Sequence, residues 1–403
     1  MLSGRPASLY CWIAESLDPP CPALGPLRLG LCCIFHEQPI KFRNTTVTAI
    51  GRMPREAALA KLSGLCLANA EALRQALQFC AERGIGCFRI NSQILPVKSH
   101  GECGYDVHDL PEGEEIVRQF QACGQFAAAH NIRTCFHPDQ FVVLNSPRAD
   151  VVERSLAELE YQAEVAEWVT ADVINIHGGG AYGDKAAALA RFAENLGRLS
   201  DRVRSRLTVE NDDVTYTPSD LLPLCRAEGI PLVYDVHHHR CRPDGLSVEE
   251  ATAAAIETWP REPLFHVSSP IEGWNGLNPR RHHDFIDPAD FPECWIGRTV
   301  TVEVEAKAKE VAVLKLMGQL AERWTVYIVR CADGSFYTGI AQDLTQRVEK
   351  HNAGTAARYT RSRRPVELVY HEGRTTKSKA LKRELAIKAL TRKEKEALIR
   401  SAR

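Results

Sequence analysis

Short apolar runs alternate with longer helical patterns along most of the chain. Eight runs have the length and composition of buried strands, and the segments between them, such as 71–84 and 153–169, carry apolar residues at helical spacing. Eight strands alternating with helices over about 280 residues predict an α/β fold, a (β/α)8 or TIM barrel. A doubly wound open sheet competes, but no GxGxxG motif follows the first run. The predicted strands are 28–33, 85–90, 133–138, 173–178, 206–211, 231–236, 263–268 and 299–306.

The ends of these strands carry histidines and carboxylates instead of turn residues. In PLVYDVHHH (231–239) an apolar run ends in Asp235 and three histidines. Because all strands of such a barrel run parallel, their C-terminal ends converge on one mouth, where active sites are built. The residues of this kind at or after the strand ends are His100, His137, His177, Glu210, Asp235, His238, His266, His283 and Glu305.

This set predicts a metal centre. Carboxylates repel one another and buried imidazoles need partners, so the nine groups require a cation. Mixed histidine and carboxylate ligation suits zinc, manganese or iron. Nine ligands exceed the shell of one ion, so we expect two or three ions. Any one histidine alone is more often structural, and only their joint placement favours ligation. His237 and His239 are expected to support the ligands or to be solvated.

Charge divides the chain into an acidic body and a basic C-terminal segment. From residue 323 onward there are 19 Lys and Arg against 8 Asp and Glu, whereas the rest of the chain has 31 and 43. This shift predicts a domain boundary near Trp324. Residues 307–324 are expected to form the last barrel helix and to run directly into the second domain. The predicted units are an N-terminal extension (1–26), a barrel (27–322) and a basic domain (323–403).

Composition indicates the cellular setting. The first 26 residues lack an unbroken apolar segment, which argues against a signal peptide, and we expect them to be poorly ordered. The 14 cysteines include no CxxC pair, and several lie inside apolar runs, as in a reducing cytoplasm. No apolar stretch is long enough to span a membrane. We therefore expect a cytoplasmic protein that is a monomer and has no organic cofactor.

Six motifs between residues 27 and 318 resemble the UV-damage endonucleases, barrel enzymes related to endonuclease IV. The resemblance implies an enzyme that nicks damaged double-stranded DNA on the 5′ side of UV photoproducts. It also implies a three-metal site that prefers Mn²⁺, with Zn²⁺ as the alternative, held by the nine strand-end residues. The motifs are FRINSQILPVKSH (88–100), FHPDQFVVLNSP (136–147), INIHGGGAYGDK (174–185), VENDD (209–213), YDVHHH (234–239) and VEAKAKE (304–310).

Three positions depart from the family pattern. The family reads damage partly with a Gln-Tyr pair after the third strand, where this chain has Gln140 and Phe141. At the end of the first strand the family has an aromatic residue, whereas this chain has Leu31. Two residues before the histidine of the seventh strand, relatives have a lysine, whereas this chain has Leu264. These departures leave the metal ligands intact and bear on which lesion is preferred.

The basic segment contains a hairpin that leads into a helix. Asp333-Gly334 is a hairpin turn between two predicted strands that carry Tyr327 and Tyr337. Arg347 and His351 are spaced i,i+4 and share a helical face. Residues 324–400 resemble the GIY-YIG nuclease domain, a small α+β fold, with VYI and YTG in place of its two triplets.

This second resemblance implies a role for each residue. Tyr327 and Tyr337 would bind and activate water, Arg347 would stabilise the phosphate charge, and His351 would assist. Glu384 would hold a single Mg²⁺ ion. A domain that only binds DNA remains the alternative. The arginines expected to contact DNA phosphates are Arg358, Arg361, Arg363 and Arg364.

Three other functions remain open for the whole chain. An abasic-site endonuclease would share the metal centre and differ in its lesion loops. A metal-dependent sugar isomerase would also present carboxylates and histidines at strand ends, but it needs fewer histidines and no basic domain. A DNA-binding scaffold with degenerate sites is the third.

Overall fold

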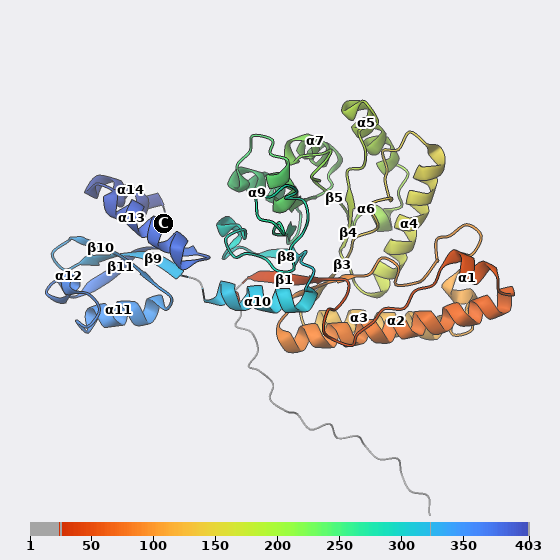
Figure 1. The fold of residues 1–403 in the computed structure, drawn as a ribbon, viewed down its shortest axis with the longest axis horizontal. Coiled ribbons are helices and arrows are strands. Elements are labelled where there is room, and N and C mark those ends of the chain that lie inside the picture. Colours follow the sequence, from red (N-terminus) through yellow and green to blue (C-terminus); the bar gives the residue numbers. More distant parts are fainter. Residues whose placement is uncertain (1–23, 25, 323, 402–403) are drawn as a thin grey trace, which may run out of the picture.

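Eight parallel strands form a closed barrel in the computed structural model, which describes residues 24, 26–322 and 324–401 (Figure 1). The strands follow chain order around the barrel, which confirms the predicted (β/α)8 architecture. The expectation for residues 1–26 lies outside the described residues except at 24 and 26. The strands are β1 Leu27–Cys32, β2 Cys87–Ile90, β3 Arg133–Phe136, β4 Val173–His177, β5 Leu207–Glu210, β6 Leu232–Asp235, β7 Leu264–Val267 and β8 Val300–Val304.

Strand pairing closes the barrel without an edge. β1 pairs in parallel with β8, with Leu27 opposite Val300 and Leu31 opposite Val304. Nearly every strand residue is buried, because one face meets the barrel interior and the other meets the surrounding helices. The apolar runs of the sequence form strands at the predicted places, with ends that differ by at most two residues.

The helices cover the outside of the barrel and include two segments of the predicted pattern, α2 and α4 (Figure 1). α2 ends at Gly84, which adopts a left-handed φ of 72°. In the described ranges, no helix is long and apolar enough to cross a membrane. The helices are α1 Val47–Gly51, α2 Arg55–Arg83, α3 Gly113–Ala129, α4 Ala149–Trp168, α5 Lys185–Leu196, α6 Asp201–Arg204, α7 Pro218–Glu228, α8 Val236–Cys241, α9 Val248–Ile256 and α10 Lys309–Ala321, with 3₁₀ turns at Val107–Asp109 and Glu293–Trp295.

The stretch YDVHHH changes directly from strand to helix. β6 ends at Asp235 and α8 begins at the next residue, so no separate turn is needed. Asp235 is the N-cap of α8, and its Oδ1 accepts a hydrogen bond of 2.7 Å from the backbone N–H of His238. The cap holds the two side chains near each other at the barrel mouth.

A second, smaller unit follows the barrel. Its three strands form an antiparallel sheet in the order β10-β9-β11, with helices packed on both faces (Figure 1). The predicted hairpin is confirmed, because β9 and β10 pair in register around Gly334, whose φ is 77°. The elements are β9 Trp324–Cys331, β10 Phe336–Ala341, α11 Leu344–Asn352, α12 Arg358–Arg361, β11 Val366–Arg374, α13 Lys377–Ala389 and α14 Arg392–Ser401.

The two units contact each other beyond their covalent connection. α10 ends at Ala321 and β9 begins at Trp324, as the absence of a Gly/Ser-rich linker predicts. The loop before β8 meets the segment between β11 and α13. Arg374 Nε lies 3.3 Å from Glu293 Oε2, and Lys379 Nζ donates a hydrogen bond of 2.8 Å to the carbonyl of Ala289.

Candidate active sites

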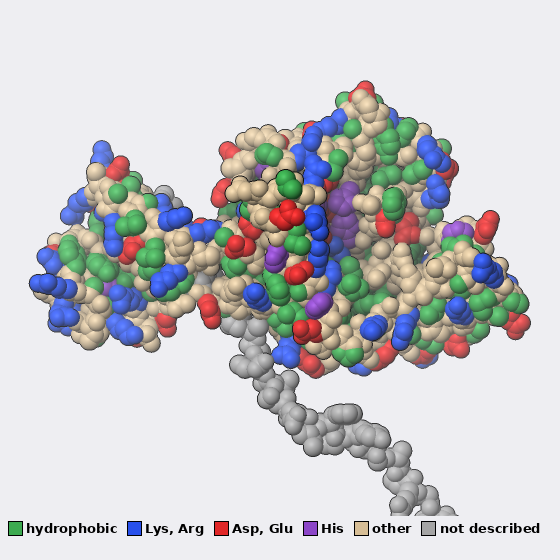
Figure 2. Space-filling view, viewed as in Figure 1, with side chains coloured by type: hydrophobic (Ala, Val, Ile, Leu, Met, Phe, Trp, Pro, Cys, Tyr) green, Lys and Arg blue, Asp and Glu red, His purple; other side chains and the backbone are tan. Residues whose placement is uncertain are grey.

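The C-terminal ends of the barrel strands open into a cleft of about 1410 Å³. Figure 2 shows histidines gathered in a hollow on this face, with Lys and Arg side chains beside it. Loops that follow β2, β3, β4 and β5 form much of the wall. The predicted site residues that line it are His100, His137, Gln140, Phe141, His177, Glu210, His238 and Glu305.

Glu210 is the hub of the cluster. It is buried, and its Oε2 lies 2.9 Å from His137 Nε2. Its Oε1 lies 3.3 Å from His238 Nδ1 and 3.1 Å from His266 Nδ1. The amide of Asn175 donates a hydrogen bond of 2.6 Å to Oε2 and fixes the carboxylate. One carboxylate therefore faces three imidazoles from three different strand ends.

Asp235 and Glu305 extend the cluster. Asp235 Oδ2 lies 3.5 Å from His238 Nδ1 and 4.0 Å from His266 Nδ1. Glu305 Oε1 lies 3.6 Å from His266 Nδ1, so His266 faces all three carboxylates. His177 approaches from the other side, with its ring 5.0 Å from that of His137.

The donor atoms fall into three overlapping groups that fit metal ions. Within each group the atoms lie no more than 4.8 Å apart. Three buried polar atoms in the cluster, His177 Nδ1, Asp235 Oδ2 and His266 Nδ1, have no hydrogen-bond partner among the described residues. Buried polar groups normally have partners, so these atoms fit metal coordination. The groups are His137, Glu210 and His266; Glu210, Asp235 and His238; and Asp235, His266 and Glu305.

The electrostatics of the cluster favour a cation. Burial alone would raise the pKa of Glu210, but the His266 and His177 imidazoles hold it well below its usual range. Burial would lower the pKa of His238, yet Asp235 and Glu210 raise it well above its usual value. The pKa of His266 rises to about 10, because Glu210 and Glu305 outweigh burial. These carboxylates attract positive charge to the mouth, which a divalent ion can supply in place of protons.

A backbone carbonyl orients the ring of His137. Its Nδ1 lies 3.0 Å from the carbonyl of Pro138, to which it can only donate. Its Nε2 is the ring nitrogen directed into the cluster, 2.9 Å from Glu210 Oε2. A backbone carbonyl on one imidazole nitrogen commonly orients the other nitrogen toward a metal.

Two of the predicted ligands lie outside these contacts. His100 lines the cleft, and its Nδ1 accepts hydrogen bonds of 3.2 Å from the N–H groups of Glu102 and Cys103, which leaves Nε2 available. His283 does not reach the cluster. Its Nδ1 accepts a hydrogen bond of 2.9 Å from the N–H of Phe285.

The adjacent histidine takes the place expected for His283. His282 Nδ1 lies 3.9 Å from Glu305 Oε2, and its ring is 6.3 Å from that of His238. The structure therefore places His282 beside Glu305, and which of the two histidines is a ligand stays a prediction. The sequence HHD does not show which of the two histidines points to the cluster. The side chains of helices and strands alternate with a fixed period, whereas those of an irregular loop do not.

Two of the three residues that differ from the family pattern are buried. Leu31 is fully buried in the barrel core, and Leu264 packs in the barrel interior with Cys87 and Cys135. By contrast, Phe141 is 75% exposed on the loop after β3, beside the exposed Gln140. Of the three residues that differ from the family pattern, only Phe141 lines the cleft.

The second unit brings four of its predicted residues together. Tyr327 Oη lies 2.8 Å from His351 Nε2 and accepts a hydrogen bond of 3.2 Å from Arg347 Nε. The ring of Tyr337 is 5.1 Å from that of His351. Burial and then Arg347 lower the pKa of His351, which keeps its imidazole neutral. Glu384 lies on α13 and pairs with Lys388 at 2.9 Å.

Sequence reasoning missed Arg89 and Glu303, which lie under the barrel cluster. Arg89 pairs with both Glu303 and Glu305 and is almost fully buried. Both residues lie inside strands, whereas the ligands were predicted from the residues at strand ends. A charged residue in the apolar run CFRI was the available signal, since buried charges are nearly always paired.

A barrel whose strand ends carry a cluster of this kind belongs to the class of TIM-barrel enzymes with metal-binding residues at the mouth. The family model of UV-endonuclease UvdE matches residues 27–333, and that of the GIY-YIG catalytic domain matches residues 323–397. The chain belongs to the UvdE UV-endonuclease family and carries a C-terminal GIY-YIG domain. It is thus a DNA endonuclease, which excludes the sugar isomerase and the inactive scaffold.

Individual relatives agree with this assignment. A UV DNA damage endonuclease of Bacillus velezensis is 31% identical over 303 residues, which cover 72% of this chain and 91% of the relative. One of Bacillus pumilus is 31% identical over 300 residues, with the same coverage. The crystal structure of SacUVDE superposes with a TM-score of 0.65 at 28% identity, over 73% of this chain and 98% of that one.

Proposed function

We propose that the barrel nicks duplex DNA on the 5′ side of UV photoproducts by multi-metal phosphodiester hydrolysis. The observation that carries the proposal is the set of three overlapping donor groups around Glu210, at the floor of an open cleft. Overlapping groups suit ions that share ligands, as in two-metal phosphodiester hydrolysis. The proposed ligands are His100, His137, His177, Glu210, Asp235, His238, His266, His282 and Glu305.

The donor chemistry favours Mn²⁺, with Zn²⁺ as the alternative. Six imidazoles exceed what Mg²⁺ or Ca²⁺ prefers, and the carboxylates suit Mn²⁺. Ions held by these residues would lower the pKa of a bound water and would stabilise the charge on the phosphate and on the departing oxygen. The chain itself orients the ligands, through Asn175 at Glu210 and the Pro138 carbonyl at His137. It need supply little acid–base catalysis of its own.

The loop after β3 supplies the proposed lesion contact. Phe141 and Gln140 are exposed above the cleft and are free to enter an opened duplex. The ring of Phe141 and the amide of Gln140 can fill the space of a distorted base pair. Stacking of a base on an aromatic ring needs no hydroxyl group, so Phe141 can take the place of the family tyrosine.

Phe141→Ala is expected to lower kcat/KM on a photoproduct duplex roughly 5- to 150-fold, the equivalent of one lost base–aromatic stack. Metal content should stay at the wild-type level, because Phe141 lies outside the ligand cluster. Leu277→Ala is the matched control, since Leu277 is also exposed on a loop but does not line the cleft. Equal rates for Phe141→Ala and wild type would contradict a lesion-reading loop.

We also propose that the GIY-YIG domain cleaves DNA and uses one Mg²⁺ ion held by Glu384. Tyr327 and Tyr337 would bind the attacking water, and neutral His351 stands within hydrogen-bond distance of Tyr327. Arg347, which already contacts Tyr327, would stabilise phosphate charge.

The basic surface of this domain is proposed to hold the DNA backbone. Arg358, Arg361 and Arg364 are exposed, whereas Arg363 is half-buried and pairs with Asp333 at 2.9 Å. Arg363 also stacks on Tyr359, so its guanidinium is less free than the other three.

Replacing Arg358, Arg361 and Arg364 together with alanine is expected to weaken DNA binding and its salt dependence. Each lost phosphate contact should reduce the slope of log K against log salt by about 0.9. The measurement is DNA binding at several salt concentrations. Alanine at Arg74, Arg118 and Arg226, which lie on outer barrel helices, is the matched control. An unchanged slope in the first variant would contradict this role.

The direct test of function is nick mapping. The full chain, with the GIY-YIG domain inactivated by Arg347→Ala and loaded with Mn²⁺, is offered matched duplexes with a thymine photoproduct, an abasic site or no lesion. A nick immediately 5′ of the photoproduct is the expected result. Cleavage at the abasic site alone would assign the alternative lesion, and no cleavage of any duplex would overturn the proposal.

A further inference from the structure

A second tier of polar residues lies directly beneath the barrel cluster. Glu303 and His266 are opposite each other on β8 and β7, and both are fully or almost fully buried. His266 Nε2 lies 2.8 Å from Glu303 Oε2. The other ring nitrogen, Nδ1, faces Glu210, Asp235 and Glu305.

Arg89 completes this tier from β2. Its Nε donates a hydrogen bond of 2.7 Å to Glu303 Oε2, and its guanidinium also pairs with Glu305 at 2.7 Å. The same guanidinium lies 3.1 Å from His266 Nε2. His266 Nε2 thus stands between a carboxylate, which can only accept a hydrogen bond, and a guanidinium, which can only donate one.

These two neighbours favour opposite tautomers of His266. If Glu303 prevails, Nε2 carries the proton and Nδ1 offers its lone pair to the cluster. If Arg89 prevails, Nε2 accepts a hydrogen bond, and Nδ1 carries the proton and cannot ligate a metal. Within the part of the chain that the structure describes, Nδ1 is buried without a hydrogen-bond partner, which fits coordination through this atom.

We propose that Glu303 is a positioning residue that holds the proton of His266 on Nε2 and directs Nδ1 to the metal. The inference rests on the proposed metal centre. A carboxylate behind a ligating histidine fixes the ring and raises its basicity. Without Glu303, Arg89 keeps only Glu305 as a carboxylate partner, which is itself a proposed ligand.

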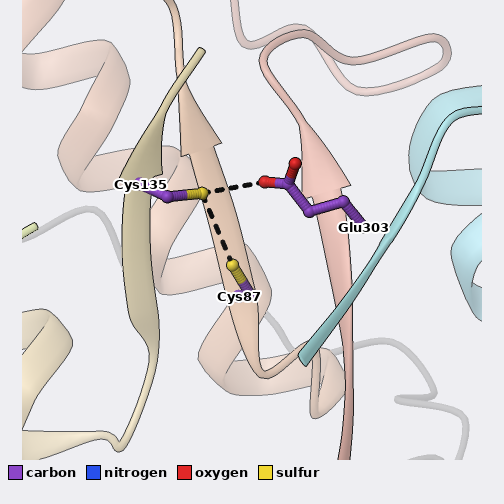
Figure 3. A group of neighbouring side chains, drawn as sticks. All are labelled: Cys87, Cys135 and Glu303. Carbon is purple, nitrogen blue, oxygen red and sulfur yellow. Dashed lines mark hydrogen bonds between the residues drawn. The ribbon is translucent and has the colours of Figure 1, made fainter. Parts of the chain in front are cut away.

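The Cys135 thiol supports the Glu303 carboxylate. Cys135 donates a hydrogen bond of 2.8 Å to Glu303 Oε1, and Cys87 Sγ lies 3.8 Å from Cys135 Sγ (Figure 3). The three residues are close enough to suggest a separate soft-metal site. We reject that reading, because Arg89 already neutralises Glu303 and would repel a second cation beside it.

β1, which lies between β2 and β8, has a glycine beside the polar residues of the second tier. Gly30 of β1 pairs with Cys87 on one side and Glu303 on the other. An added Cβ at Gly30 would lie 3.1 Å from Cys87 Cβ and 3.3 Å from Glu303 Cγ. The missing side chain leaves space for the Glu303 carboxylate inside the barrel.

The test measures Mn²⁺ affinity of the full chain by equilibrium titration. Glu303→Leu is expected to weaken binding about 10- to 100-fold. Glu303→Gln should retain most of the affinity, because its amide oxygen still accepts the Nε2 proton. Cys87→Ala is the control, since among the described residues no hydrogen bond joins Cys87 to Glu303 or His266, and it should bind as wild type does.

A double variant separates positioning from structural damage. Glu303→Leu leaves Arg89 poorly paired, and the added substitution Arg89→Met removes this buried charge. The double variant should recover the thermal stability of the metal-free protein and still bind Mn²⁺ weakly. Wild-type affinity in Glu303→Leu, or full recovery of affinity in the double variant, would overturn the inference. A wild-type chain that binds no Mn²⁺ would instead overturn the proposed function.

Discussion

Glu210→Gln is expected to abolish nicking by the barrel, with a loss of about 10³-fold or more in kcat/KM. Glu210 contacts His137, His238 and His266 and belongs to two of the three donor groups. The substitution keeps the size of the side chain but removes the charge that the ions share. Metal content and photoproduct cleavage, measured on the same preparation with Arg347→Ala in both proteins, should fall together.

Glu153→Gln is the matched control for this change. Glu153 lies on α4 and pairs with Arg198 on the outside of the barrel, so the same loss of charge should leave metal content and cleavage intact. Full cleavage by Glu210→Gln would mean that the cluster does not hold the catalytic ions.

Arg347→Ala is expected to have the second largest effect, on the other nuclease site. Measured in the Glu210→Gln background with Mg²⁺, DNA cleavage should fall roughly 10²- to 10³-fold, as expected when a group that stabilises phosphate charge is lost. Arg347 also donates to Tyr327, so the orientation of that hydroxyl group is lost with it.

A neighbouring cation on the same helix provides the comparison. Lys350 lies on α11, and among the described residues its Nζ donates only to the side chain of Gln346, so Lys350→Ala removes a charge outside the Tyr327 cluster. It should retain cleavage. Absence of Mg²⁺-dependent cleavage in the Glu210→Gln parent itself would show that this domain binds DNA without cutting it.

The strand-end residues could be predicted because two simple rules converge on them. A buried strand has a recognisable apolar pattern, and all strands of a parallel barrel end at one mouth. Glu210, Asp235 and His266 each lie at or next to a strand end, and the structure brings them together.

The positions of other site residues could not be predicted from strand patterns and strand ends. The loop that carries His282 has no period, so sequence alone could not choose between it and His283. Arg89 belongs to a second tier inside the barrel, where pairing depends on distances across strands. Glu303 did have a signal, because it lies two residues before Glu305 and alternate residues of a strand share a face.

The central claim is that a multi-metal centre at the barrel mouth cuts the DNA. Its most direct test is to strip the full-length Arg347→Ala protein of metal, add Mn²⁺ in steps, and measure bound ions and photoproduct nicking together. We predict two or three ions per barrel, with nicking that appears as they bind and disappears with a chelator. Nicking by the metal-free protein, or full activity with fewer than two ions bound, would contradict the account.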